Sequence, residues 1–246
     1  MSFPCLLSIP HGGILVPPEV KELILLREED LLRDGDPFTG ELYDLPAASV
    51  VRMEIARAVV DVNRAPDDLP PRNPDGVVKS HTCFGKEVYR KPLTGELIRL
   101  LLEKFYVPYH SRIREALENR EVLIAFDCHS MAPHPPPLTG DGSRRPAICL
   151  GDNHGKACRR EVTELLARCM GEAFDLPEKE IALNRPFAGG YITRTYGGKP
   201  KFWIQIEIRR DLYMDWENLR RREDLLRNTR EKIRRALSLF FERVSL

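Results

Sequence analysis

Short apolar runs alternate along the chain with longer segments that have helical spacing. The runs predict strands, and apolar residues at every third or fourth position predict helices. Strands are predicted at 5–9, 48–53, 58–63, 122–125, 146–150, 181–184, 187–192 and 201–209, and helices at 19–26, from Pro37 onward, and at 93–119, 156–174 and 216–244. Alternating strands and helices predict one α/β domain with a mixed, largely parallel sheet.

The strand at 201–209 alternates strictly in its second half. This period of two places Ile204, Ile206 and Ile208 on one face of the strand. Glu207 therefore points to the opposite face, presented by a strand that we expect to be internal. A carboxylate in that position suits a general base, although an ion pair with Arg209 or Arg210 is the alternative.

Two histidines follow apolar runs at the predicted ends of strands. The run 122–125 continues into Asp127 and His129 before prolines stop it, and the run 5–9 is followed by His11. Ligands bind at the carboxyl ends of strands in open α/β sheets. The pair therefore indicates a metal site assembled from separate strands, whereas either histidine alone fits an ordinary hydrogen-bonded role.

Two further polar residues have both a functional and a structural interpretation. Asp36 comes shortly after His11 and directly before Pro37, so it suits either a metal ligand or a helix N-cap. Arg64, next to Asn63, suits a substrate carboxylate, because guanidinium presents paired N–H donors. A salt bridge from Arg64 to Asp67 or Asp68 is the alternative.

Composition excludes several classes of function. The net charge is +1, which gives no basic field for nucleic acid, and no run is long enough to span a membrane. The start of the chain lacks the pattern of a secretion signal, and the six cysteines show no CxxC spacing, so we expect a reduced, cytoplasmic protein. Turn-forming residues predict an irregular excursion of loops and a hairpin from the single domain around 65–91.

Six segments in order resemble the N-formylglutamate amidohydrolase family. They are Ser-Ile-Pro-His-Gly-Gly at 8–13, the Asp36 segment ending in Glu-Leu-Tyr-Asp at 41–44, Val-Asp-Val-Asn-Arg at 60–64, Asp-Cys-His-Ser at 127–130, Gly-Gly-Tyr-Ile at 189–192 and Gln-Ile-Glu-Ile at 205–208. The resemblance covers nearly the whole chain. It implies a three-layer α/β/α fold similar to that of zinc carboxypeptidases and of the succinylglutamate desuccinylase and aspartoacylase group.

The resemblance also implies a zinc enzyme of histidine degradation that hydrolyses an N-acyl acidic amino acid. The expected substrate within that class is N-formyl-L-glutamate. The metal ligands would be His11, Asp36 and His129. The HxxE metal motif of carboxypeptidases is absent after His11, so Asp34 and Glu41 are alternatives to Asp36.

In the same resemblance, Asn63 and Arg64 hold a substrate carboxylate and Glu207 is the base. Glutamate has a second carboxylate, for which Arg90 and Arg194 are the candidates. Two other functions fit the same segments: a carboxypeptidase-like hydrolase of short peptides, and a ligand-binding protein that keeps the fold without turnover.

Overall fold

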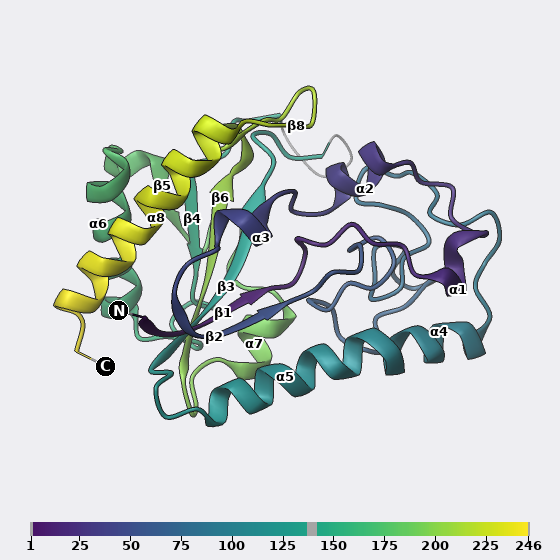
Figure 1. The fold of residues 1–246 in the computed structure, drawn as a ribbon, viewed down its shortest axis with the longest axis horizontal. Coiled ribbons are helices and arrows are strands. Elements are labelled where there is room, and N and C mark those ends of the chain that lie inside the picture. Colours follow the sequence, from purple (N-terminus) through teal and green to yellow (C-terminus); the bar gives the residue numbers. More distant parts are fainter. Residues whose placement is uncertain (1, 137–141, 246) are drawn as a thin grey trace.

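The computed structural model describes residues 2–136 and 142–245, which form a three-layer fold around one six-stranded sheet (Figure 1). The strand order is β2-β1-β3-β6-β4-β5. The strands are β1 (Phe3–Ile9), β2 (Ala47–Arg52), β3 (Ile124–Met131), β4 (Ile148–Gly151), β5 (Ile181–Leu183) and β6 (Phe202–Arg209). Strands β2, β1, β3 and β6 run parallel, and β4 runs antiparallel to β6 with β5 parallel to β4. The mixed, largely parallel sheet is confirmed.

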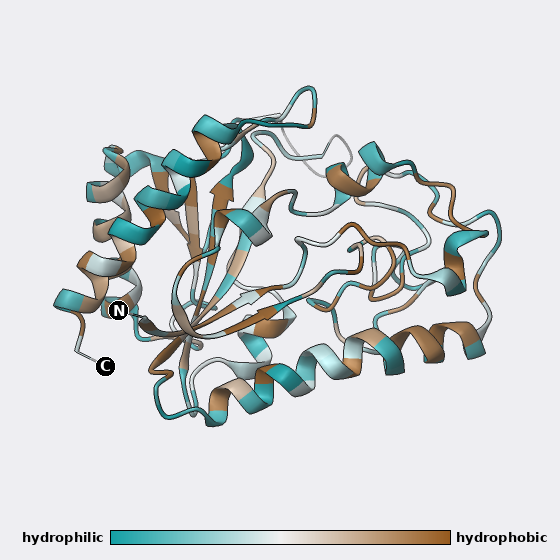
Figure 2. Ribbon diagram, viewed as in Figure 1, coloured by the Kyte–Doolittle hydropathy of each residue, from teal (hydrophilic) through white to brown (hydrophobic). Residues whose placement is uncertain are grey.

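Helices cover both faces of the sheet. They are α1 (Pro18–Lys21), α2 (Glu28–Asp34), α3 (Thr39–Leu42), α4 (Gly95–Leu101), α5 (Val107–Glu118), α6 (Arg160–Phe174), α7 (Tyr191–Tyr196) and α8 (Glu223–Arg243). Helices α6 and α8 lie on one face, and α5 and α7 lie on the other (Figure 1). The visible side of α8 is mostly hydrophilic, whereas the strands behind it are mostly hydrophobic (Figure 2).

Period-two alternation in the central strands separates a packed face from a functional face. Phe126 and Ile204 belong to the apolar core under α6 and α8. Their neighbours Ala125 and Trp203 point to the other face, where they pack with Tyr109 of α5. Strands β3 and β6 are in register, with His129 paired to Glu207. The alternation therefore places both polar side chains on the face opposite α6 and α8.

The helix predicted at 93–119 is one long helix with an irregular centre. Between α4 and α5 it passes through a π-helical segment, Leu102–Tyr106, which ends just before Pro108. Single π turns inside α-helices are frequent near functional sites. In this chain the segment carries Tyr106, whose hydroxyl reaches the turn that contains Arg64.

Three predicted elements were wrong. Residues 58–63 form turns instead of a strand, because the apolar run is buried by packing on all sides and the N–H of Asp61 bonds to the carbonyl of Val77. Residues 191–196 form α7 instead of extended chain. The segment before α8 forms the small hairpin β7 (Met214–Asp215) and β8 (Arg220–Arg221) instead of the first turns of a helix.

The irregular excursion occupies the end of the molecule opposite α6 and α8 (Figure 1). Isolated bridges, such as the one between His81 and Glu87, replace a regular hairpin there. Within the part of the chain that the structure describes, none of the helices combines the length and the apolar composition needed to cross a membrane.

Candidate active site

A cavity of about 920 Å³ opens at the carboxyl ends of β1, β3 and β6. The three strands deliver one polar residue each, because His11 follows β1, His129 lies near the end of β3 and Glu207 lies beside it in β6. Most residues singled out from the sequence line this cavity: His11, Asp36, Asn63, Arg64, His129, Arg194 and Glu207.

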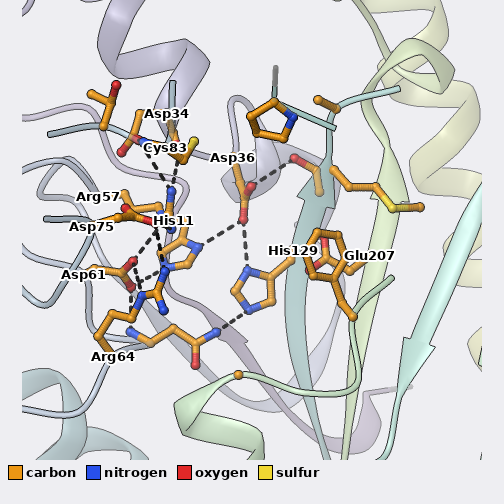
Figure 3. Close-up of a pocket in the computed structure, with 18 of the residues that line it drawn as sticks. His11, Asp34, Asp36, Arg57, Asp61, Arg64, Asp75, Cys83, His129 and Glu207 are labelled. Atoms are coloured by element: carbon orange, nitrogen blue, oxygen red, sulfur yellow. Dashed lines mark hydrogen bonds and ion pairs between the residues drawn. The ribbon is translucent and has the colours of Figure 1, made fainter. Parts of the chain in front are cut away.

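The two histidines converge on Asp36 (Figure 3). Atom Nδ1 of His129 lies 3.0 Å from Oδ2 of Asp36, and Nδ1 of His11 lies 3.4 Å from the same oxygen. All three side chains are buried, and one ligand atom from each lies within 4.8 Å of the others. This group is the only one of its kind in residues 2–136 and 142–245 that meets the geometry of a three-ligand metal site.

Each histidine is held by partners at its other ring nitrogen. Atom Nε2 of His11 lies 2.8 Å from Oδ1 of Asp61. Atom Nε2 of His129 lies 3.2 Å from Oδ2 of Asp127 and 3.1 Å from Nδ2 of Asn63. A carboxylate behind a histidine is the usual partner of a metal-ligating imidazole, because it fixes the tautomer and ring orientation. The arrangement leaves the two Nδ1 atoms to face Asp36.

Asp36 is oriented by a buried arginine. Atom Nη2 of Arg210 donates to Oδ1 of Asp36 at 2.9 Å, and Nε of Arg210 donates to Oγ of Ser130 at 3.1 Å. Because Oδ1 is occupied in this way, Oδ2 is the oxygen turned toward the histidines. Asp36 is not a helix N-cap, since α3 begins only at Thr39.

The electrostatic environment calls for positive charge at this group. Burial alone would lower the pKa of His129, but the carboxylates of Asp127 and Asp36 outweigh burial and raise that pKa well above its usual range. A divalent cation supplies the same charge, and two imidazole nitrogens with one carboxylate oxygen are ligands that zinc accepts. The residues present therefore fit a divalent metal ion.

The two alternative carboxylates are engaged elsewhere. Asp34 accepts from Nζ of the fully buried Lys79 at 2.9 Å, and Glu41 forms an ion pair with Arg221 at 2.5 Å. Burial would raise the pKa of Asp34, but Lys79 and Arg57 outweigh it and bring that pKa to about 2. Neither residue belongs to the convergent group.

Glu207 is buried in the cavity wall and carries an unusual pKa. Burial raises that pKa to about 7, although the charge of His129 opposes the shift. Atom Nε2 of Gln205 donates to Oε1 of Glu207 at 2.8 Å. The nearby arginines have other carboxylate partners, since Arg209 pairs with Asp211 and Arg210 pairs with Asp36.

Asn63 and Arg64 face the cavity from a turn that α5 and its π segment hold in place. The hydroxyl of Tyr106 donates to the carbonyl of Arg64 at 2.9 Å, and Nε2 of His110 lies 3.0 Å from the carbonyl of Val62. Figure 3 shows Arg64 on one side of the histidine pair and Glu207 on the other.

Arg64 pairs with an acidic residue other than the two expected. Atom Nη2 of Arg64 donates to Oδ2 of Asp75 at 2.9 Å, so Asp67 and Asp68 are not its partners. The Arg64 side chain keeps 35% of its surface exposed, which leaves N–H donors accessible in the cavity.

The two candidates for a second cation have different outcomes. Arg194 lines the cavity from α7, with an exposed side chain. The prediction for Arg90 does not hold. Arg90 is exposed and lies outside the cavity lining, in a segment whose backbone pairs with Leu23.

The close packing around Gly190 explains why the Gly-Gly-Tyr-Ile segment needs a glycine at this position. A Cβ atom at position 190 would lie 2.2 Å from Nδ2 of Asn63, which is the atom that contacts His129. The N–H of Gly190 also donates to Oε1 of Gln205 at 2.6 Å. One glycine therefore lies between the Asn63 side of the cavity and the Gln205–Glu207 side.

Sequence reasoning missed a network of buried charges beside His11. Arg57 pairs with Asp61 at 3.0 Å, and Lys79 pairs with Asp75 at 2.5 Å as well as with Asp34. Only the presence of Asp61 in the Val-Asp-Val-Asn-Arg segment gave a signal. Arg57, Asp75 and Lys79 lie in irregular segments, where no periodic pattern marks which side chains turn inward.

Comparisons with known proteins agree on one family. The model of the family described as N-formylglutamate amidohydrolase matches residues 3–214. N-formylglutamate deformylase of Pseudomonas putida is 33% identical, covering 95% of this chain and 91% of that protein, and the deformylase of Pseudomonas aeruginosa matches with the same three values.

Two solved structures have a similar fold. N-formylglutamate amidohydrolase from Ralstonia eutropha JMP134 aligns with a TM-score of 0.81 at 22% identity, covering 99% of this chain and 96% of that one. A protein from Agrobacterium tumefaciens aligns with a TM-score of 0.66 at 21% identity, covering 96% and 91%. At these identities the likeness shows the fold alone.

Proposed function

This chain belongs to the N-formylglutamate amidohydrolase family, and from that premise we propose that it hydrolyses N-formyl-L-glutamate to L-glutamate and formate with one divalent metal ion. The observation that carries the proposal is the register of β3 and β6. It places the carboxylate of Glu207 beside His129, within the same cavity as His11 and Asp36.

His11, Asp36 and His129 would hold the metal, with zinc the ion that best suits two imidazoles and a carboxylate. When bound, such an ion supplies Lewis acidity that favours attack of water on the formyl carbon. Asp61, Asp127 and Arg210 act behind these ligands, because they fix the histidine rings and the orientation of the carboxylate.

Glu207 is the general base in this proposal. Its carboxylate takes a proton from the attacking water as the new C–O bond forms. The proton then passes to the amide nitrogen as the C–N bond breaks, so that formate and the amino group of glutamate leave. A pKa of about 7 suits both halves of this transfer near neutral pH.

Arg64 and Asn63 are proposed to position the substrate. Arg64 offers its guanidinium to one substrate carboxylate, and Asn63 joins this turn to the catalytic group through its contact with His129. A paired guanidinium–carboxylate contact fixes direction as well as distance, which holds the formyl group at the histidine pair.

The direct test is product release by purified, zinc-loaded protein. Two products are measured under the same conditions. They are formate released from N-formyl-L-glutamate and the C-terminal amino acid released from dipeptides. We expect a kcat/KM for N-formyl-L-glutamate far above that for any dipeptide. Faster cleavage of dipeptides would favour the carboxypeptidase-like function, and turnover of neither substrate class together with tight ligand binding would favour a binding protein.

A further inference from the structure

The substrate of the proposed function has two carboxylates, and Arg64 accounts for one of them. The inference below rests on the proposed function and concerns the cation that receives the other. Six arginines line the cavity: Arg33, Arg57, Arg64, Arg145, Arg194 and Arg210. Arg57 and Arg210 are committed to buried aspartates, Asp61 and Asp36 respectively. They hold the scaffold of the site and are not free to receive a ligand.

Arg33 and Arg194 are less suited than Arg145. The Cζ atom of Arg33 lies 5.4 Å from the centroid of the Trp216 ring. Arg210 contacts the same ring, so Arg33 lies beside another positive charge. Arg194 is exposed on α7, where water weakens the attraction between a guanidinium and a carboxylate. Arg145 is half-buried, so its attraction for an anion is screened less.

The Arg145 guanidinium is held in place without a carboxylate partner among the described residues. Its Nη1 donates weakly to the carbonyl of Ala132 at 3.4 Å, and its Cζ lies 5.0 Å from the centroid of the Phe187 ring. The backbone is fixed too, because the N–H of Arg145 donates to the carbonyl of Pro133 at 2.8 Å and its carbonyl accepts from Arg209 at 2.7 Å. The guanidinium of Arg145 therefore offers its paired N–H donors to the cavity from a fixed position.

Backbone contacts place Arg145 on the Glu207 side of the cavity. Its carbonyl accepts from Nη1 of Arg209 at 2.7 Å, and Arg209 ends β6, the strand that carries Glu207. The influence of the Glu207 charge on the pKa of Arg145 agrees with this position. Arg64 has a different set of neighbours, Asp61 and Asp75. The cavity thus has one accessible guanidinium on the Asn63 side and another on the Glu207 side, which suits a ligand with two negative groups.

We propose that Arg145 binds the substrate carboxylate that Arg64 does not hold, so that the two arginines together select a dicarboxylate. A guanidinium stacked on Phe187 has lost much of its rotational freedom, and a carboxylate that reaches it gains two parallel hydrogen bonds. An amide in place of the carboxylate has no charge and cannot accept both hydrogen bonds.

The test compares three substrates that differ by one group. N-formyl-L-glutamine lacks the charge of the side-chain carboxylate, and N-formyl-L-isoglutamine lacks that of the α-carboxylate. We expect the wild-type protein to prefer N-formyl-L-glutamate to each amide by about 10²-fold in kcat/KM, the order of a lost charge-assisted contact. In Arg145→Met we expect the preference for N-formyl-L-glutamate to be lost against one amide and kept against the other. In Arg64→Met we expect the two amides to exchange these outcomes.

Two variants sharpen the comparison. Arg145→Lys keeps the charge and loses the fork, so it should retain only part of the preference. Arg144→Met is the matched control, because Arg144 is exposed, pairs with Asp211 and lies outside the cavity lining. Its kinetics should equal those of the wild type. The proposal is overturned if Arg145→Met keeps both preferences, or if Arg194→Met shows the collapse instead.

Binding of the product separates this inference from the proposed function. Titration calorimetry with L-glutamate, L-glutamine and L-isoglutamine needs no turnover, so it reads the two carboxylate sites even if N-formyl-L-glutamate is not hydrolysed. We expect Arg145→Met to weaken L-glutamate binding and to leave binding of one amide unchanged. Equal weakening for all three ligands would make Arg145 a structural residue. Absence of hydrolysis with intact selectivity for L-glutamate would count against the proposed reaction alone.

Discussion

Protonation of Glu207 depends on its immediate surroundings. Burial favours the neutral acid, whereas the neighbouring His129 favours the carboxylate and the Gln205 amide bonds to the charged form. These opposing influences leave the pKa at about 7. The carboxylate and the acid are then both accessible near neutral pH, which a group that accepts and returns a proton requires.

Replacing Glu207 by Gln tests this assignment. The amide keeps the size of the side chain and removes the proton acceptor, so we expect kcat/KM for N-formyl-L-glutamate to fall by about 10²–10⁴-fold. Bound metal should remain, because Glu207 is outside the group of His11, Asp36 and His129. Both quantities are measured on one preparation. Retained activity would place the base elsewhere, and loss of metal would make Glu207 a ligand.

Single residues of the site were predictable where a strand marks them. His11 and His129 follow apolar runs, and the alternation in 201–209 gives the face of Glu207. Arg210 was not predictable as the partner of Asp36, because the two are far apart in sequence and meet only once the sheet has formed. The same holds for Asp61, whose contact with His11 requires the turn at 61–64.

At the scale of elements, the site depends on how irregular segments pack against regular ones. The turn that carries Asn63 is fixed from α5 through His110 and from the π segment through Tyr106. From the other side, the start of α7 meets Asn63, whose Oδ1 accepts from the N–H of Ile192 at 2.8 Å. Two helices therefore set the position of one amide at the cavity.

Gly190→Ala should disturb this junction. The added methyl group would meet Nδ2 of Asn63 at 2.2 Å, so Asn63 must move away from His129. A misplacement of about 1 Å at a catalytic group costs on the order of 10² in rate, and we expect kcat/KM to fall by that order. Gly95→Ala is the control, because a Cβ atom at that position meets nothing within 4 Å. Equal activity in both variants would contradict the role of the junction.

Elements with a clear period were predictable from the sequence, and elements without one were not. The central strands and the helix at 93–119 follow from alternation and helical spacing. The run 58–63 misled because a buried turn and a buried strand have the same composition. The segment 187–192 misled because it was expected to be extended, whereas Tyr191 and Ile192 begin α7 and Gly190 allows the close approach to Asn63.

At the scale of the whole molecule, the chain holds several ionisable groups in its interior. His110 is one that lies away from the convergent metal group, with its ring between the carbonyl of Val62 and the hydroxyl of Tyr196. Burial lowers its pKa from 6.5 to about 4, aided by the charge of Arg114 and opposed by Asp127. The folded state therefore takes up this proton at a lower pH than the unfolded state.

This shift links stability to pH. The stabilisation is complete above pH 6.5 and is lost as pH falls toward about 4, because only the unfolded chain binds the proton in that window. We expect the loss to be on the order of 3 kcal/mol in the free energy of unfolding. Urea denaturation of wild type and His110→Gln at several pH values checks this. Glutamine does not titrate, so its curve should be flatter, and parallel curves would contradict the prediction.

The proposed hydrolysis requires a metal ion held by the convergent group of His11, Asp36 and His129. The most direct measurement is formate release from N-formyl-L-glutamate by protein stripped with a chelator and then reloaded with one equivalent of Zn²⁺. We predict that stripping abolishes formate release, that reloading restores it in the wild type, and that it restores nothing in His129→Ala. Full formate release by protein shown to be free of metal would contradict the account.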